Sequence, residues 1–143
     1  MDCIICKKHA NFDLYTGNPV AELGGMVVSH FPVINGAPAN KGHFLIEAQR
    51  HVVDTGDLTD EESKSLGFLI SKSIKVLTSG LGAEHAYAFR INDLVPHFHF
   101  HIIARYPNTP KEFWGHKISD WPGTTKLDLV QVKLLSDQIR KLY

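Results

Sequence analysis

The sequence has no excess of charge, few cysteines and no long apolar stretch among its 143 residues. Fifteen Lys and Arg side chains balance fifteen Asp and Glu side chains, so no net field attracts nucleic acid or a membrane surface. No apolar run approaches the roughly 20 residues that a membrane-spanning helix needs. The N-terminus also lacks the basic flank and apolar core of a signal peptide, so we expect a cytoplasmic protein.

A chain of this length can bury one core but is too short for two domains of ordinary size. We find no internal repeat, low-complexity tract or linker in the sequence. We therefore predict a single domain over residues 1–143, with a core over about 1–105 and a C-terminal extension that contains a helix over 106–143.

Hydrophobic spacing along the chain predicts the fold class. Thr59 and Glu62 form a capping-box pattern before apolar residues at helical spacing, which predicts a helix that stops near Gly80 and Gly82. The remaining patterns predict strands over 25–31, 43–47, 86–91 and 97–104, and an amphipathic helix over 127–142. Because a short turn separates the last two strands, we expect them to pair antiparallel. This order of elements indicates an α+β fold with an antiparallel sheet.

Three histidines alternate with apolar residues over positions 97–103, which read HFHFHII. Because alternate side chains of a strand point to opposite faces, His97, His99 and His101 should share one face while the intervening phenylalanines enter the core. Three unrelated histidines are a poor explanation, since imidazole has no strand preference that would repeat it. A mononuclear metal site remains an alternative, because a His-x-His pair on a strand can supply two ligands.

The same segment resembles the signature of the histidine-triad (HIT) superfamily and matches it at every position. Positions 41–52 (KGHFLIEAQRHV) resemble a second landmark, a Gly-His-hydrophobic strand followed about eight residues later by a His-hydrophobic pair. The opening CIICK, positions 3–7, resembles the start of many bacterial and archaeal members. The resemblance covers about residues 1–105 and implies a HIT-like fold, with about five antiparallel strands, a central helix and a C-terminal helix.

The resemblance places the nucleophile of a nucleotide hydrolase or transferase at His99. An imidazole has an ordinary pKa near 6.5, so much of it is neutral and nucleophilic at pH 7. Attack on the α-phosphate of a nucleoside phosphoramidate or dinucleoside polyphosphate would give a nucleotidyl-histidine, which water resolves. The resemblance also implies a backbone carbonyl that holds the other ring nitrogen. It places His101 and His43 beside the phosphate, as catalytic and substrate-binding companions.

Asn92, in the turn before the triad, resembles an asparagine that binds the phosphate or ribose of the substrate. An ordinary turn residue is an equal alternative at this position. The sequence gives neither the base nor the leaving group of the substrate.

A second set of residues, Cys3, Cys6, His51 and His97, combines two thiols with two imidazoles. Such a set satisfies tetrahedral zinc, and Cys-x-x-Cys has the usual ligand spacing. In zinc-bearing relatives, including galactose-1-phosphate uridylyltransferases, the matching positions bind one ion. The resemblance therefore implies a structural Zn²⁺ and no organic cofactor. An unmetalled thiol pair and a redox pair remain alternatives.

Two departures from the family pattern bear on activity. On the strand predicted over 25–31, many relatives carry an Asp that binds the ribose hydroxyls, whereas positions 28–31 (VSHF) contain no acidic residue. The turn over 92–96 (NDLVP) also lacks the Gly-Gln-Ser/Thr segment that many relatives have before the triad. A nucleotide-binding or scaffold protein with little or no turnover is therefore the alternative function. Trp114 and Trp121 follow the triad, and we expect ordinary packing for both, with a pocket cover or dimer seam as the alternative.

The resemblance also implies a homodimer, and two-fold dimers are the commonest oligomers. The expected partner is a small-molecule nucleotide, and we expect neither nucleic acid nor a membrane as a partner. The remaining histidines, His9, His30, His85 and His116, receive no role beyond surface or core packing.

Overall fold

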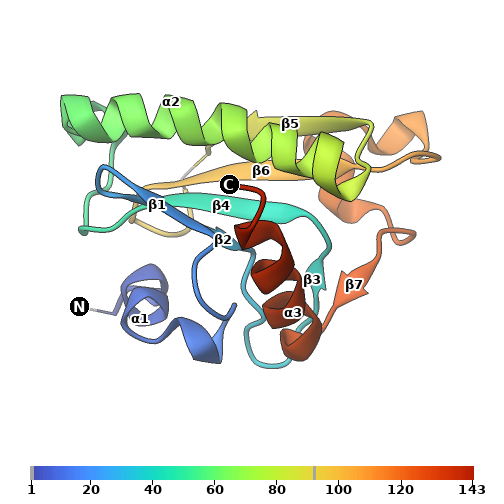
Figure 1. The fold of residues 1–143 in the computed structure, drawn as a ribbon, viewed down its shortest axis with the longest axis horizontal. Helices are drawn as coiled ribbons and strands as arrows, with labels where there is room; N and C mark the ends of the chain where they lie inside the picture. Colours follow the sequence, from blue (N-terminus) through green and yellow to red (C-terminus); the bar gives the residue numbers. More distant parts are fainter. Residues whose placement is uncertain (1, 92) are drawn as a thin grey trace.

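An antiparallel sheet of five strands, in the order β1-β2-β4-β6-β5, lies at the centre of the computed structural model, which describes residues 2–91 and 93–143 (Figure 1). The strands are β1 (Ala21–Leu23), β2 (Met26–His30), β4 (His43–Ala48), β6 (His99–Arg105) and β5 (His85–Phe89). A separate two-stranded ladder joins β3 (Ala39–Asn40) to β7 (Lys126–Leu127). The α+β fold class and the five-stranded antiparallel sheet are therefore confirmed.

Helices cover the sheet on both sides. The α-helices are α1 (Ile4–Ala10), α2 (Asp60–Lys75) and α3 (Leu129–Arg140). Figure 1 shows α2 lying along one face of the sheet, with α1 on the opposite side. The shorter helical turns are Phe12–Leu14, Thr55–Asp57, the π-turn Val76–Gly80, Lys111–Phe113 and Gly115–Asp120. None of the helices in the described part of the chain combines the length and apolarity that crossing a bilayer requires.

Helix α2 begins where the sequence pattern predicts. Thr59 is the N-cap: its hydroxyl accepts from the Glu62 amide at 3.1 Å, while the Glu62 carboxylate accepts from the Thr59 amide at 2.9 Å. Such a reciprocal cap stabilises a helix start by about 1 kcal/mol per satisfied donor. The helix continues into the π-turn that ends at Gly80, in agreement with the predicted stop.

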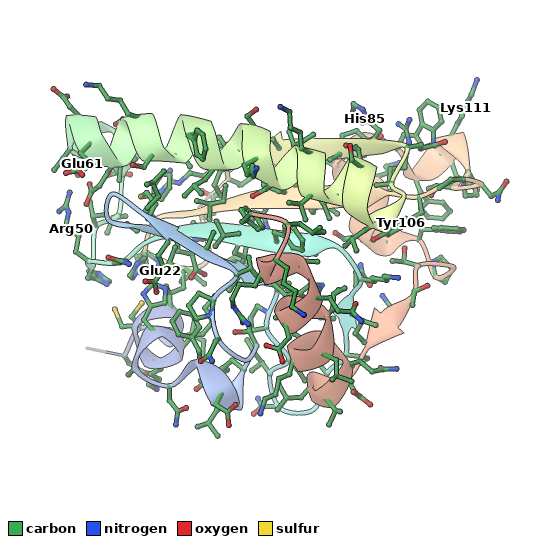
Figure 2. The ribbon with its side chains drawn as sticks, viewed as in Figure 1. Glu22, Arg50, Glu61, His85, Tyr106 and Lys111 are labelled. Carbon is green, nitrogen blue, oxygen red and sulfur yellow. The ribbon has the colours of Figure 1, made fainter. Side chains whose placement is uncertain are left out.

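The core lies between α2 and the sheet, and Figure 2 shows side chains filling this space. Phe44, Ile46, Phe98 and Ile102 are fully buried and belong to one apolar cluster. Burying a side chain of this size contributes roughly 1.5–3 kcal/mol. Helix α3 adds Val132 and Ile139 to the same cluster. The apolar face of the triad strand therefore anchors the opposite, histidine-bearing face.

The strand limits differ from prediction at the start of the triad segment. Strand β6 begins at His99 rather than at His97, because the His97 amide donates to Val95 O at 2.8 Å within the preceding turn. Strand β5 ends at Phe89 and β2 covers Met26–His30, each shorter than predicted. The antiparallel pairing of β5 with β6 is confirmed. The sequence patterns did not predict α1, β1 or the β3–β7 ladder.

Candidate active site and metal cluster

The face of the sheet opposite α2 carries the candidate active site. In the β4–β6 register Glu47 lies opposite His99 and Leu45 lies opposite His101, while Phe89 of β5 also lies opposite His101. Residues paired in this way share one face of an antiparallel sheet. The Phe89 ring stacks on the His101 ring, with centroids 5.2 Å apart and planes within 18°. The two histidines within β6 are thus held on a rigid surface.

Glycine at position 42 sets the start of β4 and so places His43. Its φ of +81° favours glycine, and a Cβ there would lie 2.9 Å from the Ala104 Cβ. The Gly42 amide donates to His30 Nε2 at 3.1 Å, and His30 Nδ1 donates to Phe31 O at 3.0 Å. Burial lowers the pKa of His30 to about 4. His30 is therefore a neutral core histidine with both ring nitrogens satisfied.

The His99 ring is fixed by the main chain. His99 Nδ1 donates to the carbonyl oxygen of His97 at 2.7 Å. A carbonyl oxygen only accepts, so Nδ1 carries the proton and Nε2 keeps its lone pair. The backbone partner expected from the family resemblance is therefore present.

His43 and His101 form a direct hydrogen bond between His43 Nε2 and His101 Nδ1, at 2.8 Å. Burial, together with the His101 ring, holds the pKa of His43 well below its usual range. Burial and the neighbouring His99 ring lower the pKa of His101 to about 4. Both rings are therefore neutral at pH 7, and one proton is shared along the bond between them.

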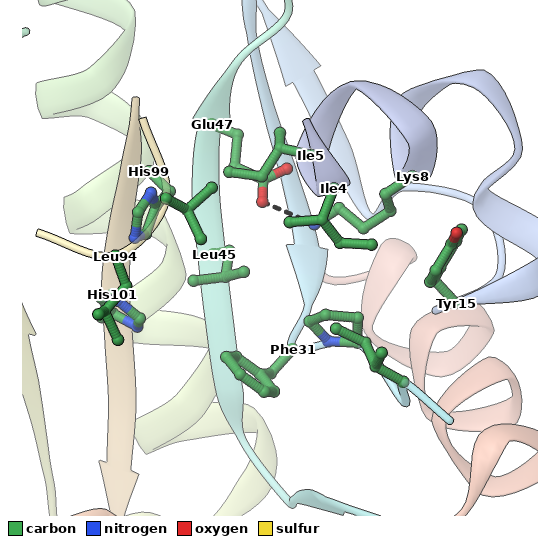
Figure 3. A pocket seen from close by; sticks show the side chains of 13 residues that line it. Ile4, Ile5, Lys8, Tyr15, Phe31, Leu45, Glu47, Leu94, His99 and His101 are labelled. Carbon is green, nitrogen blue, oxygen red and sulfur yellow. Dashed lines mark hydrogen bonds and ion pairs between the residues drawn. The ribbon is translucent and has the colours of Figure 1, made fainter. Parts of the chain in front are cut away.

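A cavity of about 240 Å³ opens beside His99 and His101 (Figure 3). Its walls are mostly apolar, with a polar floor made by Lys8 and Glu47. The lining side chains come from α1, from the residue after the Phe12–Leu14 turn, from the segment after β2, from β4, and from β6 and the turn before it: Ile4, Ile5, Lys8, Tyr15, Phe31, Pro32, Ile34, Leu45, Glu47, Leu94, Val95, His99 and His101. Apolar walls around a few fixed polar groups are typical of a small-molecule site.

The floor of this cavity is a buried ion-pair network that the sequence analysis missed. The Glu47 carboxylate is fully buried and accepts from Lys8 Nζ at 2.7 Å and from His9 Nε2 at 2.7 Å. Lys8 Nζ also donates to Ser29 Oγ at 3.1 Å. Burial alone would raise the pKa of Glu47, but Lys8 and His9 outweigh it and lower that pKa to about 2. His9, which received no role from sequence, thus joins α1 to β4.

The four residues predicted to bind zinc come together at the N-terminus of α1. The His97 Nδ1 atom lies 3.5 Å from the Sγ atoms of both Cys3 and Cys6, and His51 Nδ1 lies 3.4 Å from Cys6 Sγ. All four ligand atoms lie within 4.8 Å of one another. Zinc bonds are about 2.3 Å to sulfur and 2.0–2.1 Å to nitrogen. At a tetrahedral angle these bond lengths place a sulfur ligand about 3.5 Å from a nitrogen ligand, which is the sulfur–nitrogen distance in this cluster.

The side chains around this cluster also suit a bound metal. His97 Nε2 donates to Ala48 O at 2.7 Å, which leaves the lone pair on Nδ1 directed at the thiols. Cys3 and His97 are buried, and both cysteines are free rather than disulfide-bonded. The donor set, the distances and the tautomer therefore fit a tetrahedral metal ion.

The remaining predicted residues have varied positions. Asn92, predicted to bind substrate, lies outside the described residues. Trp114 donates from Nε1 to Thr109 O at 3.0 Å and stacks under the Arg105 guanidinium at 3.7 Å. Neither tryptophan appears among the described residues that line the cavity.

Comparison with known proteins identifies the family. A model of the HIT domain matches residues 30–108, more than half of the chain, so the protein belongs to the HIT domain family. The chain is 28% identical over 145 residues to an adenosine 5′-monophosphoramidase of Schizosaccharomyces pombe, covering 97% of this chain and 96% of that protein. It is also 30% identical over 117 residues to an AP-4-A phosphorylase of Mycobacterium tuberculosis, covering 70% of this chain and 60% of that protein.

Solved structures share the fold. A hypothetical histidine triad nucleotide-binding protein from Sulfolobus tokodaii superposes with a TM-score of 0.70 at 16% identity, over 98% of this chain and 91% of that one. A Zn-bound histidine triad family protein from Mycobacterium smegmatis superposes with a TM-score of 0.61 at 17% identity, over 100% and 99% of the two chains. These structures support the HIT-like fold that the sequence motifs predicted.

Proposed function

We propose that this protein is a nucleotide hydrolase or transferase that cleaves the bond between the α-phosphate of its substrate and the leaving group, through a nucleotidyl intermediate on His99. The observation that carries the proposal is the His99 Nδ1–His97 O hydrogen bond of 2.7 Å, on a ring that lines the cavity. This bond leaves the Nε2 lone pair as the nucleophile.

The reaction takes two displacements. Nε2 attacks the α-phosphorus, a P–N bond forms, and the leaving group departs with the electron pair of its bond to phosphorus. The leaving group takes up a proton from solvent as it departs, and the water of the second step returns one to solvent. Water then attacks the same phosphorus, releases a nucleoside monophosphate and restores the imidazole, while another acceptor in place of water makes the protein a transferase.

In this proposal His101 acts on the phosphate oxygens, and His43 acts through its hydrogen bond to His101. When His43 Nε2 donates to His101 Nδ1, His101 carries its own proton on Nε2 and donates it to the phosphate. Because the two rings are neutral and hydrogen-bonded to each other, the donor is held in place before the substrate arrives. Such a fixed donor stabilises the charge that develops on phosphate oxygens in the transition state.

The named relatives support two substrate classes. The S. pombe protein is named as a monophosphoramidase and the M. tuberculosis protein as an AP-4-A phosphorylase, which points to nucleoside phosphoramidates or dinucleoside polyphosphates. A cavity of about 240 Å³ with apolar walls suits one base and its ribose. Asn92 remains predicted to contact the phosphate or ribose.

The test is to trap the intermediate. The protein is mixed with an adenosine phosphoramidate or diadenosine polyphosphate, quenched within milliseconds and measured by intact-protein mass spectrometry. We expect an added adenylyl group that maps to His99, and no adduct on a His99→Ala variant. Nucleotide binding without any adduct or turnover in the unmodified protein would instead support the scaffold function.

For the metal we infer one structural Zn²⁺ per chain, held by Cys3, Cys6, His51 and His97. Two thiolates and two imidazoles leave no open position for substrate, which is the pattern of a structural rather than a catalytic zinc site. Metal analysis of protein purified without chelator should give about one zinc per chain. A protein that contains no zinc and is equally stable after Cys6→Ser would contradict this inference.

The remaining predictions concern assembly and location. We infer a homodimer of a single-domain chain, and α3 supports the single domain by entering the same core as the sheet. Light scattering at micromolar concentration should give twice the mass of the chain, and a monomer would refute the dimer. We expect the cytoplasm as the compartment, because two free thiols suit a reducing environment.

A further inference from the structure

Helix α1 belongs to two sites at once. Cys3, the N-cap residue of α1, and Cys6, its third residue, are two of the four residues of the proposed metal cluster. Ile4, Ile5 and Lys8 of the same helix line the cavity beside His99. Figure 3 shows these three side chains projecting from the helix toward Glu47 and the triad strand.

A helix of seven residues does not hold itself together. The first hydrogen-bonded turn is costly to form, and isolated helices shorter than about 12–15 residues are marginal in water. The shape of this wall of the cavity therefore depends on what fixes α1 to the rest of the protein. Two attachments are present: the metal ligands at its start, and the Lys8 and His9 bonds to Glu47 at its end.

The metal joins α1 to the strand that carries the nucleophile. The helix supplies two ligands, and His97 lies two positions before His99. Without the metal, α1 would be held at this end by packing and by the weak thiol–imidazole contacts of 3.4–3.5 Å alone. Loss of the metal should therefore loosen the side of the cavity that Ile4 and Ile5 form.

We propose that metal binding at the Cys3–Cys6–His51–His97 cluster and nucleotide binding in the cavity are thermodynamically coupled through α1, so that loss of zinc weakens the nucleotide complex. This inference rests on the proposed function, because it places the nucleotide in this cavity. Coupling of two sites is reciprocal, so a bound nucleotide must tighten zinc by the same factor. The cluster thereby makes nucleotide affinity responsive to zinc supply and to the state of the two thiols.

The direct test is a titration with AMP, the product of the proposed reaction, which reports binding without turnover. Affinity is measured by calorimetry on zinc-loaded protein and on protein stripped by chelator, and zinc affinity is measured with and without saturating AMP. We expect zinc removal to weaken AMP about tenfold or more, and AMP to tighten zinc by the same factor. Hydrogen exchange should become faster over residues 4–10 on zinc removal while α2, residues 60–75, stays protected.

Two neighbouring positions of α1 give a matched comparison in zinc-loaded protein. Ile5 is 6% exposed and lines the cavity, whereas the Lys7 side chain is 56% exposed and pairs with Asp2 at the surface. Ile5→Ala should weaken AMP several-fold with zinc content unchanged, and Lys7→Ala should bind AMP as the parent does. If zinc removal also unfolds α2, the titration of stripped protein no longer isolates the effect of α1. The Ile5→Ala and Lys7→Ala variants then provide the test, and equal AMP affinities for both would overturn the coupling.

Failure of this inference is distinguishable from failure of the proposed function. Unchanged AMP affinity and unchanged exchange over residues 4–10 after zinc removal would refute the coupling and leave the enzyme function standing. In that case the Glu47 pairs alone would hold α1. A zinc-loaded protein that binds no AMP and turns over no nucleotide would refute the proposed function itself, and the coupling with it.

Discussion

His97 and His99 lie two positions apart and use opposite ring nitrogens. His97 donates from Nε2 to Ala48 O and turns the Nδ1 lone pair toward two thiols. His99 donates from Nδ1 to His97 O and keeps the lone pair on Nε2, beside the cavity. One ring is fully buried in a cluster that fits a metal, and the other is half-buried at a site that fits a phosphate.

Residue type alone therefore does not determine what a histidine does in this segment. In each case a backbone carbonyl takes one ring proton, and the position of that carbonyl determines which nitrogen is free to bind or attack. Three histidines at alternate positions of one segment can therefore have different roles. The mononuclear alternative, with the three triad residues as equivalent ligands, does not match the cluster that the structure brings together.

Replacing each of these two histidines should separate the two roles and give the largest effect. His99→Ala removes the proposed nucleophile, so turnover should fall by more than about 10⁴-fold while zinc content stays at the parent value. His97→Ala removes a proposed metal ligand, so zinc should be lost while the folded fraction retains turnover at saturating substrate. Hydrolysis rate and metal content of both variants are the measurements. Turnover within a few-fold of the parent in His99→Ala would refute the mechanism.

Removing the metal should lower stability strongly. A ligand that binds the folded state at a concentration of about 1,000 times its Kd stabilises that state by about 4 kcal/mol. Stripping zinc, or Cys3→Ser, should therefore lower the free energy of unfolding by about this amount, measured by urea titration with and without added zinc. Equal midpoints under both conditions would mean that the cluster does not hold a structural ion.

Substitutions in the His43–His101 pair should slow the reaction without stopping it. Loss of one positioned donor typically costs on the order of 3 kcal/mol, or about a hundredfold in rate. We expect His101→Ala to lose about this factor, and His43→Ala somewhat less because it acts through His101 Nδ1. The readout is the single-turnover rate of adduct formation. Rates equal to the parent would show that the pair makes no contact with the reacting phosphate.

The smallest expected effect concerns a third kind of histidine, His30, whose nitrogens are both satisfied. Its folded pKa of about 4 lies below the ordinary 6.5, so the unfolded chain binds the proton first as pH falls. Stability should therefore decrease as pH falls from 6.5 toward 4, by about 2 kcal/mol at pH 5 from this residue. Between pH 7 and pH 5 the free energy of unfolding of a His30→Gln variant should fall by about 2 kcal/mol less than that of the parent, as measured by urea titration. Parallel pH dependences would remove His30 as the cause.

The sequence predicted the parts of the site that depend on local spacing. The period of two placed His99 and His101 together on one face, and the capping box located the start of α2. The Cys-x-x-Cys pattern and the family motifs indicated the four members of the metal cluster, which the structure brings within 4.8 Å. Ligand spacing and strand alternation depend on residues that are close together in the chain, so a single sequence is enough to recognise them.

What the sequence did not predict depends on distant contacts. Helix α1 is too short for a hydrophobic period to be recognised, and Lys8 meets a partner 39 positions away. No short-range signal pairs His9 with Glu47, although a charged residue within the predicted strand 43–47 was a reason to look for a buried partner. The start of β6 was wrong by two residues because a local turn captured the His97 amide.

The carbonyl oxygen that accepts the hydrogen bond from His99 Nδ1 affects how the site can evolve. It belongs to the main chain at position 97, so every amino acid placed there supplies the same acceptor as long as the backbone path is kept. Descendants of this sequence could therefore discard the imidazole at 97, and the ion with it, and still inherit a correctly oriented ring at 99. The two proposed roles are adjacent in sequence and should be separable by mutation.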